Sequence, residues 1–200
     1  MFNYLIRVQL PDRPGALGAV ASRIGSVGGD VVSIDILERD NGIVVDELGV
    51  GLAHDNLIDL LRDEILEVDG VSIESIRPVE GAMPDRTAEL LDITAELLTQ
   101  TSPTGLLDQL TGRVRQGLAA DYAVVVDGDG TTVVAGSGQP PERVDPDAGA
   151  QVGPHVAVAP MVDLGRTLVV GRDDPVLRER ERQWVVTMAK LADYGRRDLP

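Results

Sequence analysis

The chain has no cysteine, and its 200 residues include only one Phe, one Trp and three Tyr. The lack of cysteine excludes disulfides and thiolate chemistry. So few aromatic rings disfavour a surface that stacks on nucleic-acid bases. The 18 basic residues are outnumbered by 33 acidic ones, so the formal net charge is −15. This charge argues against nucleic acid or an anionic membrane surface as a partner.

Long apolar runs are missing as well. The opening stretch MFNYLIRVQLPDRPG lacks the apolar core of a signal peptide. No segment approaches the run of about 20 apolar residues that a membrane-spanning helix needs. We therefore expect a cytoplasmic protein that does not act at a membrane.

The sequence also lacks the usual catalytic motifs. Its two histidines, His54 and His155, have no cysteine partners for a zinc site, and no serine stands in a nucleophile elbow. The stretch DGDGTTVVAGSG has Thr131 and Gly138 where a calcium loop needs an acidic or amide ligand and a bidentate Glu, so a hairpin turn is the better interpretation. We therefore expect a non-catalytic protein with no metal and no cofactor.

The first 80 residues alternate between two periods. Four segments have the period of strands: YLIRVQL, VVSIDILE, IVVDELGVGLA and GVSIESIRPV. In the second of them, Val32, Ile34 and Ile36 are expected on one face. Two segments have helical spacing, and Gly28-Gly29 ends the first of them. Asn41-Gly42 predicts a hairpin between the second and third strands. The order βαββαβ is that of a ferredoxin-like domain.

The turn after the first strand, with the sequence DRPG, is a candidate anion site. Pro14 suits a first helical turn, and Gly15, Ala16 and Leu17 would then carry N–H groups without helical partners at the positive end of the helix dipole. A ligand carboxylate could bind there. Asp12 and Asp30 could receive an ammonium group. Asp12 could equally cap the helix by accepting from the Gly15 N–H.

In this element order, the segment DRPGALGAVASRIGSVGGDVVSIDI resembles an ACT domain, a small regulatory module that binds amino acids. The resemblance covers about residues 1–80. It implies a ligand held between two modules, against the loop after strand one and the start of strand two of the neighbour. By position, the implied ligand-binding residues are Asp12, Arg13, Gly15, Ala16, Leu17 and Asp30. Many family members have an amide near the two positions at which this chain has an acid.

The second half follows the short linker EGAMPD and resembles a GAF-type domain over roughly residues 86–197. Two helical stretches, a set of strands and a long helix from about Pro175 to Arg197 suggest an α/β sandwich. The segment GQPPERVDPDAGAQVG is short and polar where fuller members of the family build a pocket cover, which argues against a small-molecule pocket here. We expect an α+β protein with a ferredoxin-like domain over 1–80 and a GAF-like domain over 86–200.

These features favour a regulatory protein that binds a small ligand, most simply an amino acid. Two alternatives stay open: a scaffold whose domains only mediate oligomerisation, and a regulatory subunit of a separately encoded enzyme of amino-acid metabolism. A metabolic enzyme or a signalling protein would be the downstream partner. A homodimer is expected, because VVSIDILE is a sheet-edge strand with little charge.

Overall fold

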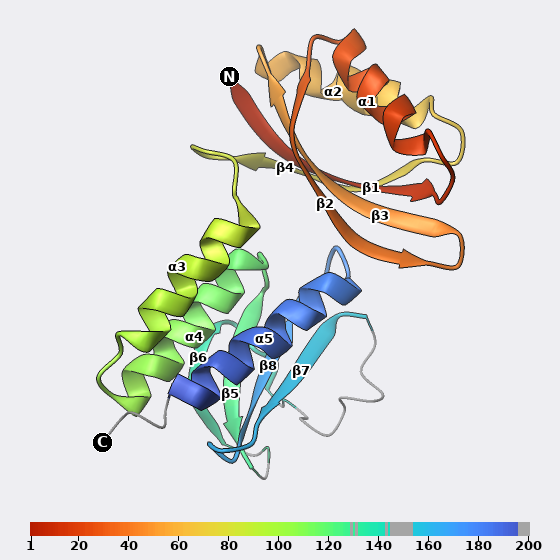
Figure 1. The fold of residues 1–200 in the computed structure, drawn as a ribbon. Coiled ribbons are helices and arrows are strands. Elements are labelled where there is room, and N and C mark those ends of the chain that lie inside the picture. The colour runs from red at the N-terminus through yellow and green to blue at the C-terminus, as the bar shows by residue number, and fades with distance from the viewer. Residues whose placement is uncertain (129, 131, 143, 145–153, 196–200) are drawn as a thin grey trace. The chain divides into compact units, whose positions relative to one another are not determined.

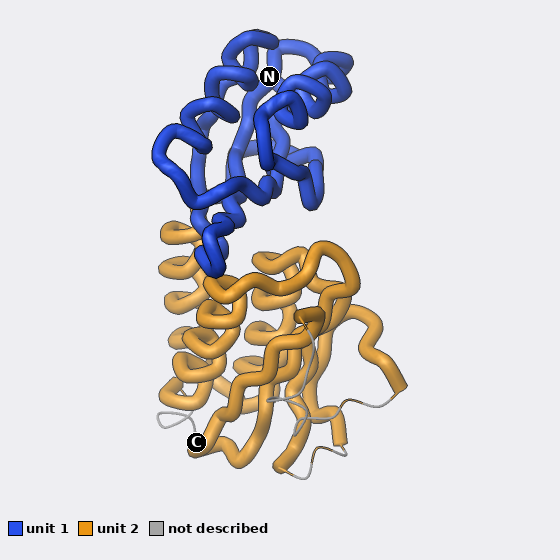
Figure 2. The backbone as a smooth tube through the Cα atoms, turned by 90° about the vertical axis from the view of Figure 1, so that its right-hand side faces the viewer, with its two compact units in different colours: residues 1–84 blue, residues 85–200 orange. Residues whose placement is uncertain are grey.

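The computed structural model describes residues 1–128, 130, 132–142, 144 and 154–195. The chain divides into two compact units, Met1–Pro84 and Asp85–Pro200 (Figure 2). Each unit has one four-stranded sheet, and all strand pairs are antiparallel. The expected α+β class is confirmed. Independent folding of the two halves stays a prediction.

The first unit has the order βαββαβ, with a short 3-10 turn at Asp55–Leu57. Its elements are β1 (Phe2–Pro11), α1 (Ala16–Ser26), β2 (Asp30–Asp40), β3 (Ile43–Leu52), α2 (Ile58–Leu66) and β4 (Ser72–Val79). The strands lie in the order β2-β3-β1-β4, and both helices cover the same face of the sheet (Figure 1). This is the ferredoxin-like topology predicted from the two hydrophobic periods.

The covered face of this sheet is made by alternate residues of its two central strands. Their buried side chains pack with apolar residues of both helices in one cluster: Tyr4, Ile6, Val8, Leu10, Val44, Leu48, Val50 and Leu52 from the strands, with Ala16, Val20, Ile24, Leu61 and Ile65 from the helices. A strand turns every second side chain to the same face, so alternation in the sequence becomes one apolar layer.

Helix α1 ends as its two glycines predicted. Gly28 has a φ of 75°, and its N–H donates to the Gly25 carbonyl at 3.0 Å. The Gly29 N–H donates to the Ile24 carbonyl, also at 3.0 Å. This pair of bonds is a Schellman motif, which satisfies helix carbonyls that would otherwise lack donors. A Cβ on Gly29 would lie 2.9 Å from Cγ2 of Ile24, so the close approach also favours glycine there.

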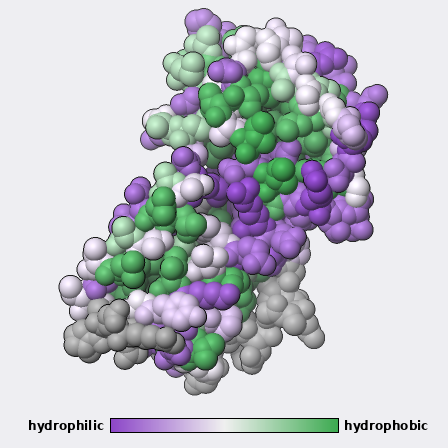
Figure 3. All heavy atoms as spheres, viewed as in Figure 1, coloured by the Kyte–Doolittle hydropathy of each residue, from purple (hydrophilic) through white to green (hydrophobic). Residues whose placement is uncertain are grey.

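Strand β2 differs from the expected alternation. Asn41 and Gly42 both have positive φ, 50° and 77°, and make the predicted hairpin to β3. However, the register with β3 shifts between Val31 and Ser33, so Val32 lies outside the regular alternation. Val32, Ile34 and Ile36 of this edge strand stay nearly half exposed, with Ile34 at 48%, whereas Leu37 is buried. Figure 3 shows that hydrophobic and hydrophilic residues are mixed on the face of the molecule that it presents.

The second unit stacks three helices on one face of its sheet (Figure 1). Its elements are α3 (Arg86–Leu98), α4 (Pro103–Gly117), β5 (Tyr122–Asp127), β6 (Val133–Gly138), β7 (Val156–Met161), β8 (Arg166–Gly171) and α5 (Glu179–Gly195). The strand order is β6-β5-β8-β7. Asp85 caps α3 by accepting from Thr87 and Ala88, and Ser102 caps α4 by accepting from Gly105.

The hairpin expected around DGDG is present, because β5 pairs with β6 and Asp127 Oδ1 accepts from the Thr132 N–H at 3.0 Å. Residues 129 and 131 of that loop lie outside the described residues. So do 143 and 145–153 of the segment GQPPERVDPDAGAQVG. Within the described part of the chain, no group of three or more His, Asp or Glu side chains could hold a metal ion. No helix among the described residues is long and apolar enough to cross a membrane.

Helix α5 begins at Glu179, four residues later than predicted, because a buried arginine binds the backbone before it. Arg172 Nε donates to the Pro175 carbonyl at 2.6 Å, and Nη2 donates to the Val176 carbonyl at 2.9 Å. Its remaining N–H groups donate to the Leu118 carbonyl and to both carboxylate oxygens of Glu181. All five donors of the guanidinium are therefore used. The predicted end at Arg197 lies outside the described residues.

This arginine should be essential for the stability of the second unit. Arg172 and Glu181 are 3% and 2% exposed, so Arg172→Met would leave a buried carboxylate without its cation. We expect a loss of about 3–5 kcal/mol in the free energy of unfolding, measured by urea denaturation followed by circular dichroism. Lys190→Met, at an exposed position of α5, is the matched control. An equal effect of both variants would contradict this prediction.

Candidate ligand-binding site

The turn between β1 and α1 is held by backbone hydrogen bonds. The Asp12 N–H donates to the Gly42 carbonyl at 2.8 Å, and the Ala16 N–H donates to the Arg13 carbonyl at 3.2 Å. Gly15 precedes the helix with a φ of 88°, a conformation that favours glycine. A Cβ on Gly15 would meet no atom within 4 Å, so the space beside it is open.

The set of available N–H groups differs from the predicted one. Pro14 lies in the turn, two residues before the first helical residue, and the N–H of Ala16 already has an acceptor in Arg13. Among the described residues, none accepts from the N–H groups of Gly15, Leu17 or Gly18. These three groups lie at the positive end of the α1 dipole, where an anion is favoured.

Asp12 does not cap α1, which was one of its two predicted roles. Its Oδ2 lies 3.5 Å from Nε of Arg39 on β2, and both side chains are partly exposed. The Arg39 side chain therefore lies close to the predicted site residue Asp12. The sequence did not indicate this pairing, because it depends on the register between β2 and β3. An exposed pair of this kind contributes little to stability and can rearrange around a ligand.

Asp30 lies far from the other five predicted residues within one chain. It is the first residue of β2 and pairs with Gly51, whereas the Asp12 N–H reaches Gly42 at the opposite end of β3. The 11 residues of β2 span about 35 Å at the usual rise of a strand. The structure thus brings together Asp12, Arg13, Gly15, Ala16 and Leu17, but not Asp30. A contribution from Asp30 of a second subunit stays a prediction.

Sequence reasoning missed a buried acid on β3. Asp46 lies opposite Val8 of β1 and Ile36 of β2, on the sheet face that the helices cover. It is 2% exposed, and its Oδ1 has no hydrogen-bond partner among the described residues. Burial raises the pKa of its carboxyl, and the charge of Arg39 acts in the opposite direction. In IVVDELGVG, an acid at the position of a core residue was the available signal.

Asp46 should cost the protein stability at neutral pH. Because burial raises its pKa, the folded state holds this proton more tightly than the unfolded state, so stability falls as the pH rises above the ordinary value of 3.8. We expect Asp46→Val to raise the free energy of unfolding by about 1–3 kcal/mol at pH 7, and by less at pH 4. Urea denaturation at both pH values measures this. Asp40→Val, at an exposed position of the neighbouring strand, is the control, and a destabilised Asp46→Val protein would contradict the prediction.

No family model matches the chain, and no curated protein matches it. Two of the similar solved structures are ACT domains. That of GTP pyrophosphokinase from Chlorobium tepidum is 19% identical over 39% of this chain and 97% of its own, with a TM-score of 0.32. An ACT domain protein from Streptococcus pneumoniae is 19% identical over 42% of this chain and 98% of its own, with a TM-score of 0.34.

A third similar structure is the GAF domain of phosphoenolpyruvate-protein phosphotransferase from Acinetobacter. It is 15% identical over 56% of this chain and 93% of its own, with a TM-score of 0.43. Solved ACT and GAF domains are thus among the structural neighbours of this protein. They are the two kinds of domain that the sequence resembles.

Proposed function

We propose that the protein is a non-catalytic regulator that binds an amino acid at the β1–α1 turn. The observation that carries this proposal is the group of three N–H donors at Gly15, Leu17 and Gly18, which have no acceptor among the described residues. Open space beside Gly15 lets a carboxylate approach them. Arg39, next to Asp12, adds a positive charge to the same region.

The ammonium group of an amino acid needs an acceptor close to this anion site. Asp12 is the nearest candidate, because it follows β1 directly and carries an exposed carboxylate. Once the ligand carboxylate binds the N–H groups and attracts Arg39, the Asp12 carboxylate becomes available to the ammonium. In this proposal the two ends of the ligand replace an exposed ion pair that contributes little by itself.

We further propose that the protein is a homodimer in which the partner's Asp30 completes the site. Strand β2 is at the edge of its sheet and exposes apolar side chains, including Ile34. If two β2 strands pair antiparallel about a two-fold axis at Asp35, the middle of the strand, the partner's Asp30 lies opposite Asp40. Asp40 leads into the hairpin whose Gly42 carbonyl accepts the Asp12 N–H.

A thermal-shift screen over the twenty amino acids tests ligand binding. A ligand at 100 times its Kd stabilises the native state by about 2.7 kcal/mol, which raises the melting temperature. We expect Gly15→Val to abolish the shift, because a branched side chain would fill the open space at the N–H groups. Gly28→Val is the matched control, since this glycine has a similar φ of 75° at the other end of α1.

Asp30→Ala should also weaken the shift, whereas Asp69→Ala, at an exposed position, should not. Absence of a shift with every amino acid in the unmodified protein would overturn the proposal.

Light scattering tests the dimer separately from the ligand. We expect a mass about twice the 21.3 kDa of one chain. Ile34→Lys should produce monomers by placing a charge in the pairing region, whereas Leu60→Lys, equally exposed on α2, should not. A monomer of the unmodified protein at micromolar concentration would contradict the proposal.

A scaffold that only joins subunits is the second candidate function, and the exposed apolar side chains of β2 favour it. A dimer that gives no thermal shift with any amino acid would support the scaffold over the regulator.

A further inference from the structure

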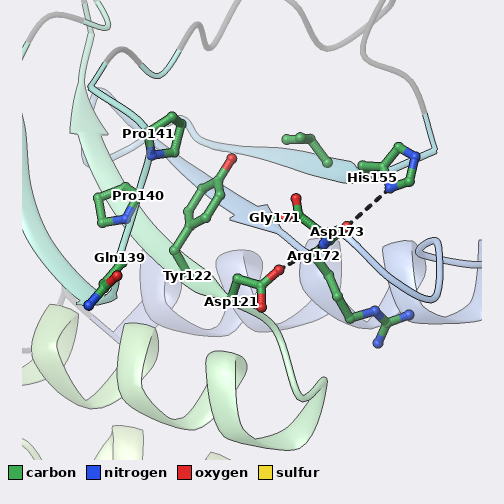
Figure 4. Close-up of a pocket in the computed structure, with 10 residues that line it drawn as sticks. Asp121, Tyr122, Gln139, Pro140, Pro141, His155, Gly171, Arg172 and Asp173 are labelled. Carbon is green, nitrogen blue, oxygen red and sulfur yellow. Dashed lines mark hydrogen bonds between the residues drawn. The ribbon is translucent and has the colours of Figure 1, made fainter.

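The second unit contains a hollow of about 400 Å³ that the proposed function does not use. Its walls come from segments far apart in the sequence (Figure 4). Asp121 and Tyr122 lie at the start of β5, Pro140 and Pro141 follow β6, His155 precedes β7, and Asp173 follows β8. The short polar segment GQPPERVDPDAGAQVG predicts that this half has no small-molecule pocket. The structure nevertheless has a hollow where the ends of the paired strands meet.

Tyr122 provides the apolar wall of this hollow. It pairs with Gly171 across β5 and β8, and a Cβ on Gly171 would overlap the tyrosine ring. The ring therefore packs directly on the backbone of β8. Figure 4 shows the ring between the two prolines on one side and His155 on the other. An aromatic face next to proline rings suits the apolar body of a small molecule.

Two carboxylates, those of Asp121 and Asp173, belong to residues that line the hollow. Asp121 Oδ2 accepts from the Asp173 N–H at 2.7 Å, which brings the two acids together. Burial, followed by the charges of Asp173 and Asp121, raises the pKa of the Tyr122 hydroxyl, so this group stays neutral at pH 7. For the carboxylate of Asp173, no described residue donates a hydrogen bond.

The arginine that lines the hollow does not balance these acids. All five N–H donors of Arg172 are directed to Glu181 and to three backbone carbonyls, away from the hollow (Figure 4). His155 Nδ1 lies 3.3 Å from the Arg172 carbonyl oxygen, so a proton on Nδ1 is donated to this backbone group and not to the hollow. The described lining therefore combines two carboxylates with an aromatic ring, and it disfavours an anionic ligand.

We propose that this hollow binds a small organic cation, a compact amine whose ammonium group lies between Asp121 and Asp173. Its apolar part packs on the ring of Tyr122 and on Pro140 and Pro141. Charge-assisted hydrogen bonds to the carboxylates and apolar contact with the aromatic and proline rings provide the binding energy. This site is independent of the one at the β1–α1 turn, where the N–H groups select a carboxylate.

Isothermal titration calorimetry of the full chain tests the charge selectivity. The probes are n-butylamine, phenethylamine and choline, with 2-phenylethanol as the neutral analogue and 3-phenylpropionate as the anionic analogue of phenethylamine. We expect at least one of the three amines to bind, at least tenfold more tightly than the alcohol and the carboxylate. Failure of all three amines to bind, or equal binding of phenethylamine and its analogues, would overturn the proposal.

Variants then test the residues. Asp173→Asn should weaken amine binding at least tenfold, because it removes one charge without removing a hydrogen bond that the fold uses. Tyr122→Leu should weaken binding several-fold by removing the aromatic face. Asp108→Asn, at an exposed position of α4, should leave it unchanged. An Asp173→Asn protein that binds the amine as tightly as the unmodified protein would overturn the assignment. Gly15→Val should leave amine binding intact, so failure of the amino-acid proposal and failure of this one are distinguishable.

Discussion

Each unit of this protein depends on burying one face of a four-stranded antiparallel sheet under helices. In the first unit, alternate residues of β1 and β3 make that face, and both helices pack on it. The chain must therefore leave the sheet plane at the end of β1 and return above it as α1. The positive φ of Gly15 belongs to this change of direction. The available N–H groups of the candidate site are thus a consequence of how the sheet is covered.

Arg172 and Asp46 are both buried, but of the two only Arg172 has hydrogen-bond partners in the described part of the chain that offset the loss of its hydration. Arg172 is surrounded by acceptors for all five of its donors, so its burial is compensated and it stabilises the second unit. Asp46 lies at a core position with no partner for Oδ1 among the described residues, so its burial is not compensated.

The two candidate sites differ in the sign of their charge. The β1–α1 turn offers N–H donors and the nearby Arg39, which suit a carboxylate. The hollow in the second unit offers Asp121 and Asp173 beside an aromatic ring, which suit a cation. A protein with a net charge of −15 can hold an anion only where local donors outweigh the overall field. The helix N-terminus provides such donors, because its N–H groups are fixed in direction.

Local features of this protein were determined by the sequence alone. The βαββαβ order, the end of α1 at Gly28-Gly29 and the Asn41-Gly42 hairpin depend on backbone preferences of residues that are near neighbours in the chain. Only the tertiary structure decided that Asp12 lies beside Arg39, that Asp46 is buried and that Asp30 is far from the turn. These facts depend on the strand register, which pairs residues many positions apart in the chain. Each bulge in β2 also shifts the later contacts of that strand by one residue.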